Sequence, residues 1–81
     1  MDPIEIQRLI EAGIDNATVQ IVTDDNTHFQ AIVVADEFEG LRPIARHQRV
    51  YQCLGSLVGN EIHALSIRAL TPKELQSQQG R

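Results

Sequence analysis

The chain has 81 residues, enough for one small domain with a single hydrophobic core. Hydrophobic residues make up 42% and charged residues 22% of the chain, as in an ordinary globular protein, which excludes a disordered chain. No apolar stretch approaches the roughly 18 residues of a membrane-spanning helix, and the first residues lack a basic then apolar leader, so we expect a cytoplasmic protein without membrane contact. The formal net charge of −4 repels nucleic acid, whose binding would need a local basic patch.

The residue inventory also argues against an enzyme. Cys53 is the single cysteine, which excludes an internal disulfide and a four-cysteine zinc site. The chain has no glycine-rich phosphate loop, no nucleophile elbow and no helical pair of histidines around a glutamate. Asp24 and Asp25 are adjacent, and we interpret both as solvated turn residues. We therefore expect a protein without catalytic activity of its own.

The first predicted element is a helix over residues 3–12. Asp2 suits the N-cap, Pro3 suits the first helical position, and Glu5 can complete a capping box. Gly13 marks the predicted end of this helix. Its apolar residues recur at spacings of three and four: Ile6, Leu9, Ile10 and Ile14.

Two strands joined by a tight turn follow. Residues 17–23 alternate between apolar and polar side chains, and residues 28–34 resume the strand pattern with several β-branched residues. Between them, residues 24–26 have turn chemistry. We predict an antiparallel hairpin, followed by a turn over residues 36–40 that buries Phe38.

The second predicted helix begins at Pro43 and ends at Gly59–Asn60. Its apolar side consists of residues at helical spacing: Ile44, Val50, Tyr51, Leu54, Leu57 and Val58. Its polar side carries a stripe of three arginines, Arg42, Arg46 and Arg49. Three alternatives are open for this stripe: a solvated face, the docking of an acidic partner, or contacts to the phosphates of a nucleic acid.

A third strand is predicted over residues 62–70, and a capping box from Thr71 to Glu74 starts a short last helix. Residues 76–81 have nothing to bury, and we expect them to fray. The element order helix, strand, strand, helix, strand, helix indicates a single α+β domain over residues 1–81. Because a helix joins the second and third strands, these strands should be parallel, which gives a three-stranded mixed sheet with helices over one face.

The three histidines are the candidate metal ligands, because imidazole is the side chain of this chain best suited to that role. We interpret His47, on the apolar side of the second helix, as a core histidine bonded to backbone. His63 opens the third strand, where it could be buried or could project into a cleft. His28 closes the turn at the start of the second strand, a position at which histidines are usually exposed. A two-iron two-sulfur cluster takes four ligands, so two imidazoles form half a site, and a partner or a second copy must supply the rest. Cys53 is poorly aimed at His63 and lies beside the arginine stripe.

Three segments together resemble the BolA family, in their order and spacing: HFQAIVVADEFEG, RHQRVY and IHALSIRALTPKE. The short first hairpin and the closing TPKEL are most similar to the IbaG-type, acid-resistance branch of that family. The resemblance runs from about Glu5 to Leu75. It implies a fold like that of class II KH domains, which agrees with the element order derived above.

The resemblance also implies a function. BolA-like proteins are not known as enzymes; they are partners of monothiol glutaredoxins, with which they share a two-iron two-sulfur cluster in iron regulation and cluster trafficking. Glutathione belongs to the glutaredoxin side, and no cofactor is expected in the isolated protein. The family histidine that begins the last strand is a cluster ligand and aligns with His63. The second family ligand is a cysteine or histidine between the first two strands; His28 is the only candidate, although it matches the histidine of the family's HF pair at the strand start.

Two other functions remain open. Some BolA-like proteins act as transcription regulators, and Arg42, Arg46 and Arg49 would then contact DNA phosphates. The Gly-x-x-Gly loop of KH domains is absent, which argues against clamping of a single strand. The protein could instead dock on a glutaredoxin without ligating metal. Whether the isolated protein forms a homodimer is also left open.

Overall fold

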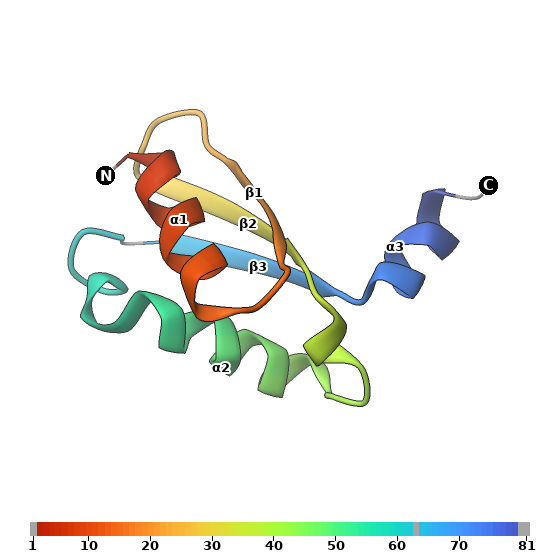
Figure 1. Cartoon of the computed structure of the whole chain (residues 1–81). Coiled ribbons are helices and arrows are strands. Elements are labelled where there is room, and N and C mark those ends of the chain that lie inside the picture. The colour runs from red at the N-terminus through yellow and green to blue at the C-terminus, as the bar shows by residue number, and fades with distance from the viewer. Residues whose placement is uncertain (1, 63, 80–81) are drawn as a thin grey trace.

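The computed structural model describes residues 2–62 and 64–79. Within these residues, no helix combines the length and the hydropathy that crossing a membrane would require. Figure 1 shows the elements in the predicted order. They are α1 (Pro3–Gly13), β1 (Thr18–Val22), β2 (His28–Val34), the 3-10 turn η1 (Asp36–Phe38), α2 (Pro43–Leu54), the 3-10 turn η2 (Gly55–Leu57), β3 (Ala64–Leu70) and α3 (Pro72–Gln79).

The three strands form one mixed sheet in the order β1-β2-β3, which confirms the predicted α+β topology. β1 and β2 are antiparallel, with Thr18 opposite Val34, whereas β2 and β3 are parallel, with His28 opposite Ala64. α1 and α2 lie over one face of the sheet (Figure 1). The core between these two layers consists of buried residues from both, including Ile6, Ile10, Ile14, Val19, Phe29, Ala31, Val33, Phe38, Val50 and Leu54.

Close contact between α1 and α2 depends on Gly13, the last residue of α1. A β-carbon on Gly13 would come within 2.5 Å of the Cys53 sulfur on α2. Glycine at this position therefore allows the two helices to approach, and the helix ends without a left-handed glycine cap. At the other end of α1, the Asp2 carboxylate accepts a hydrogen bond from the Ile4 amide at 2.9 Å, as expected for an N-cap.

The predicted end of the second helix at Gly59–Asn60 is wrong. α2 ends at Leu54, because Gly55 adopts a left-handed φ of 56° and the chain continues as the tighter turn η2. Gly55 and Gly59 consequently both lie outside the helix, each with positive φ. The earlier end brings residue 58 back beside Ile62, where an isolated bridge precedes β3.

The predicted apolar side of α2 is also wider than the part that enters the core. Val50 and Leu54 are buried, but 70% of Ile44 and 38% of Tyr51 remain exposed. At about 100° per residue, Ile44 and Tyr51 share one direction, roughly 100° from that of Val50. α2 therefore carries an exposed apolar flank beside its buried one.

α3 begins with the predicted capping box. The Thr71 amide donates to Glu74 Oε1 at 2.9 Å, and the Glu74 amide donates to the Thr71 hydroxyl at 3.1 Å. The helix continues to Gln79, so it includes part of the 76–81 segment that was expected to fray. Figure 1 shows α3 beyond the C-terminal end of β3, apart from α1 and α2. Side-chain contacts to α2 and β3 therefore have to hold it in place.

Candidate functional site

The histidine at the start of β2 is the most accessible candidate ligand in the described part of the chain. His28 has 72% of its side chain exposed. His63 lies outside the described residues, but Ala64, which follows it in the chain, is the partner of His28 in the parallel pairing of β2 with β3. His47 is half-buried on α2, so the prediction of a core histidine is wrong.

Asp25 anchors His28. Its Oδ1 atom accepts hydrogen bonds from the backbone amides of His28 and Thr27, both at 2.9 Å. Its Oδ2 atom lies 2.8 Å from Nδ1 of the His28 ring. These hydrogen bonds, above all those from the His28 amide and ring, hold the pKa of the Asp25 carboxyl well below its usual range. Asp25 is a solvated turn residue, as predicted, with 52% of its side chain exposed. Its bonds to His28 were not predicted; its spacing of three residues before a histidine was the available signal.

The rest of the turn fixes the backbone around the same histidine. The Thr23 hydroxyl donates to the His28 carbonyl at 2.8 Å and accepts from the Asn26 amide at 3.0 Å. Asn26 has a φ of 57°, a left-handed conformation that asparagine adopts more readily than most residues. The predicted turn is confirmed, and its hydrogen bonds converge on His28.

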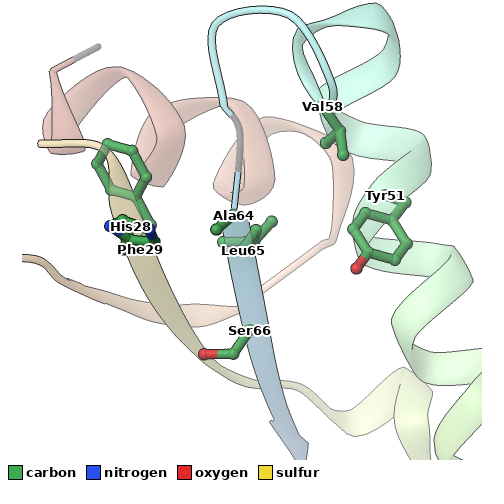
Figure 2. Close-up of a pocket in the computed structure, with 7 residues that line it drawn as sticks. All are labelled: His28, Phe29, Tyr51, Val58, Ala64, Leu65 and Ser66. Carbon is green, nitrogen blue, oxygen red and sulfur yellow. The ribbon is translucent and has the colours of Figure 1, made fainter.

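A shallow hollow of about 550 Å³ lies next to this histidine. Figure 2 shows His28 and Phe29 on β2, Ala64 to Ser66 on β3, and Tyr51 projecting from α2 toward the start of β3. Its lining is mostly apolar: His28, Phe29, Tyr51, Val58, Ala64, Leu65 and Ser66. The hollow lies between the exposed flank of α2 and the N-terminal ends of β2 and β3, and His28 is at the start of β2.

The described residues supply only part of a metal site. Among them, no group of three or more histidine, cysteine, aspartate or glutamate side chains is arranged to hold a metal ion. Cys53 packs against Gly13, its thiol bonds to the Arg49 carbonyl at 3.5 Å, and burial raises its pKa. His28 with its Asp25 contact resembles the carboxylate–histidine arrangement common at protein metal sites. His28 is thus one imidazole donor, and a four-ligand cluster bound here would need its remaining ligands from outside the described residues.

Arg46 is not a solvent-facing residue of a basic stripe. Only 12% of its side chain is exposed. Its guanidinium binds both carboxylate oxygens of Glu74, the closer at 2.6 Å, and donates to the Ala69 carbonyl at 3.0 Å. The bonds from Arg46, followed by the bond from the Thr71 amide, lower the pKa of Glu74 to about 2. Arg46 thus connects α2 to the end of β3 and to α3.

Arg49 is likewise occupied within the fold. It donates to Glu37 Oε2 at 2.9 Å and to the Gly13 carbonyl at 2.6 Å, so it joins α2 to η1 and α1. Arg42, at the N-cap of α2, is exposed. The prediction of one free stripe made of Arg42, Arg46 and Arg49 is therefore wrong, because two of its members are bonded to other elements. Contact of these residues with a partner or with DNA stays a prediction.

Comparison with known proteins identifies the family. A sequence model of the family described as BolA-like protein matches residues 4–74. The chain belongs to the BolA family. The resemblance drawn from its three segments is thereby confirmed, including the likeness to the IbaG branch.

Individual BolA relatives carry different names. The acid stress protein IbaG of Escherichia coli is 37% identical over 75 residues, which cover 91% of this chain and 88% of IbaG. The DNA-binding transcriptional regulator BolA of Vibrio cholerae is 48% identical over 50 residues, 62% of this chain and 47% of the regulator. The chain spans about half or less of the length of several curated relatives, this regulator among them.

Solved structures support the same assignment. A BolA protein homologue from Coxiella burnetii superposes with a TM-score of 0.83 at 36% sequence identity, covering 94% of this chain and 97% of that structure. The small α+β fold with a three-stranded mixed sheet is therefore the fold of a BolA protein.

Proposed function

We propose that this BolA protein is an adaptor that binds a monothiol glutaredoxin and shares a two-iron two-sulfur cluster with it. The cluster is the cargo, and the adaptor acts in cytoplasmic iron–sulfur trafficking or iron regulation without catalysing a reaction of its own. One observation carries the proposal: His28 stands exposed at the start of β2, with one ring nitrogen bonded to Asp25 and the other available for a ligand.

The pairing of β2 with β3 supports a two-histidine half-site. His28 is opposite Ala64, and His63 directly precedes Ala64 in the chain. Two imidazoles would supply two of the four cluster ligands, and the glutaredoxin with its glutathione would supply the other two.

The surface around His28 supports contact with another protein. The neighbouring hollow is lined by apolar side chains from α2, β2 and β3, and Tyr51 on its rim is partly exposed. Partly exposed aromatic residues beside a hollow are typical of the centre of protein–protein contacts. A partner that filled this hollow would also shield a cluster held at His28 from water.

The test is a titration followed by visible circular dichroism. A monothiol glutaredoxin with its reconstituted cluster is titrated with the wild-type protein and with the variants His28→Ala, His63→Ala and His47→Ala. We expect a new spectrum that saturates near one adaptor per glutaredoxin and is lost or changed in the first two variants. His47→Ala is the matched control, and its titration should overlay that of the wild type.

Each outcome has a definite meaning. An unchanged spectrum with His63→Ala would refute that residue as a ligand, and the same holds for His28. A cluster spectrum on the protein without glutaredoxin would indicate that two copies can form the site. Because a ligating imidazole must be neutral, cluster sharing should also weaken as the pH falls through the range in which histidine titrates.

A second candidate function is DNA binding, since the relative from Vibrio cholerae is named a DNA-binding transcriptional regulator. Arg42 is the exposed member of the three arginines and is the residue to test. Under this hypothesis Arg42→Glu strongly weakens binding to promoter DNA, and binding falls steeply with salt. DNA binding that is insensitive to Arg42→Glu would remove α2 as the contact.

A further inference from the structure

The contact between Asp25 and His28 determines which ring nitrogen can bind a metal. An ionised carboxylate only accepts hydrogen bonds, so a neutral His28 ring must carry its hydrogen on Nδ1, the atom 2.8 Å from Asp25 Oδ2. The other nitrogen, Nε2, then keeps its lone pair. A lone pair on Nε2 is what a metal ligand requires.

The same carboxylate holds the backbone of His28 as well as its ring. Oδ1 of Asp25 holds the His28 amide, while the Thr23 hydroxyl holds the His28 carbonyl. The backbone of His28 is therefore bonded through both its amide and its carbonyl at the first residue of β2. A ring tied at Nδ1 to a carboxylate that also binds its own backbone amide has little freedom to rotate.

We propose that Asp25 is a positioning residue for the cluster ligand His28, which it holds in the Nδ1–H tautomer so that Nε2 faces the cluster. This inference rests on the proposed function, in which His28 is a ligand. The chemical principle is general: a carboxylate bonded to the second nitrogen of a ligating histidine fixes its tautomer and raises its basicity. Removing such a partner typically weakens metal binding by about 10–100-fold.

The neighbouring carboxylate provides the matched control. Asp24 is exposed in the same turn, and the described contacts of His28 do not include it. Asp24→Asn and Asp25→Asn remove the same charge from adjacent positions. Only Asp25→Asn turns the partner of Nδ1 into an amide, which can donate to Nδ1 and so favour the Nε2–H tautomer that blocks Nε2.

The first experiment needs neither glutaredoxin nor cluster. Long-range proton–nitrogen correlation spectra of the ¹⁵N-labelled protein at about pH 8, where an ordinary imidazole is neutral, report the tautomer of His28. We expect Nδ1–H in the wild type and in Asp24→Asn, and a shift toward Nε2–H in Asp25→Asn. An Nε2–H tautomer in the wild type overturns the inference, whether or not any variant folds.

The second experiment is the circular dichroism titration with cluster-loaded glutaredoxin. The half-saturating concentration should rise about 10–100-fold for Asp25→Asn and stay unchanged for Asp24→Asn. If the tautomer changes but the titration of Asp25→Asn overlays that of the wild type, Asp25 does not position a ligand. If the wild type itself gives no new spectrum, the proposed function fails, a result that leaves the tautomer measurement unaffected.

Discussion

The two ends of the sheet use hydrogen bonds in opposite ways. At the end where β2 and β3 start, the bonds around His28 join residues no more than five positions apart. At the other end, Arg49 reaches Glu37 across 12 positions, and Arg46 reaches Glu74 across 28. The first set of bonds shapes one turn, whereas the second ties α2 to elements distant in sequence.

This difference indicates how the charged and polar residues are divided between stability and function. Long-range bonds close large loops of chain, and the two arginine side chains that make them are only 12% and 31% exposed. Local bonds orient His28 and still leave its side chain mostly exposed. We therefore expect substitutions at the arginine end to act on folding and substitutions at the histidine end to act on cluster binding.

The largest effect on stability is expected for Phe38→Ala at the arginine end. Phe38 is fully buried beneath η1, and the Arg46 guanidinium lies 6.0 Å from the centre of its ring. Removing a buried phenylalanine costs about 3–5 kcal/mol of the free energy of unfolding. Urea unfolding measures this loss of stability. Tyr51→Ala, at a partly exposed aromatic residue, should lower the free energy of unfolding clearly less. Equal losses in the two variants would contradict the assignment of stability to the arginine end.

The next effect concerns the contact of α1 with α2. Gly13→Ala should cost roughly 1–3 kcal/mol, because the added β-carbon collides with the Cys53 sulfur. Thermal unfolding of the variant measures this cost. The double variant with Cys53→Ala should recover part of it, since the closest atom is then gone. Strictly additive losses in the double variant would show that the two side chains do not meet.

A smaller effect, visible in its pH dependence, is expected for Glu74→Gln. In the folded protein the pKa of Glu74 is about 2, below the ordinary value of 4.5, so its contribution to stability is fully present above about pH 4.5 and is lost as the pH falls toward 2. The wild type should thus exceed Glu74→Gln in stability at pH 7, and the gap should close between pH 4.5 and 2. A gap independent of pH would contradict the ion pair with Arg46.

The smallest effect on stability is expected for His28→Ala. Its ring is exposed, and the Asp25 carboxylate can still bind the two backbone amides after the change. The thermal midpoint should stay within the scatter of repeated melts while cluster sharing is lost. A marked fall in the midpoint would mean that the histidine end also stabilises the fold.

Most of the fold could be predicted because its signals are local. The N-cap of α1, the alternation in the hairpin and the capping box of α3 are each contained in a few neighbouring residues. The end of α2 was misplaced because two glycines four residues apart both resemble a stop, and the sequence does not indicate that the helix already ends before the first of them, Gly55. The likeness to class II KH domains stays a prediction.

The site could be predicted less completely. His28 was found because its residue type and its place at a strand start are visible in the sequence. The role of Asp25 depends on a side-chain conformation, and the role of Arg46 depends on a partner 28 positions away, neither of which a periodicity reveals. The predicted ligand His63 lies outside the described residues, so its role stays a prediction.

The position of β3 at the edge of the sheet has a further consequence. Within the described residues β3 pairs with β2 alone, and such an edge can recruit the strand of another molecule and start aggregation. Arg46 places a charged guanidinium on the Ala69 carbonyl of this strand. Charged groups at an edge discourage such pairing. We therefore expect this arginine to protect solubility, so that a protein without it aggregates from the native state at concentrations at which the wild type stays monodisperse.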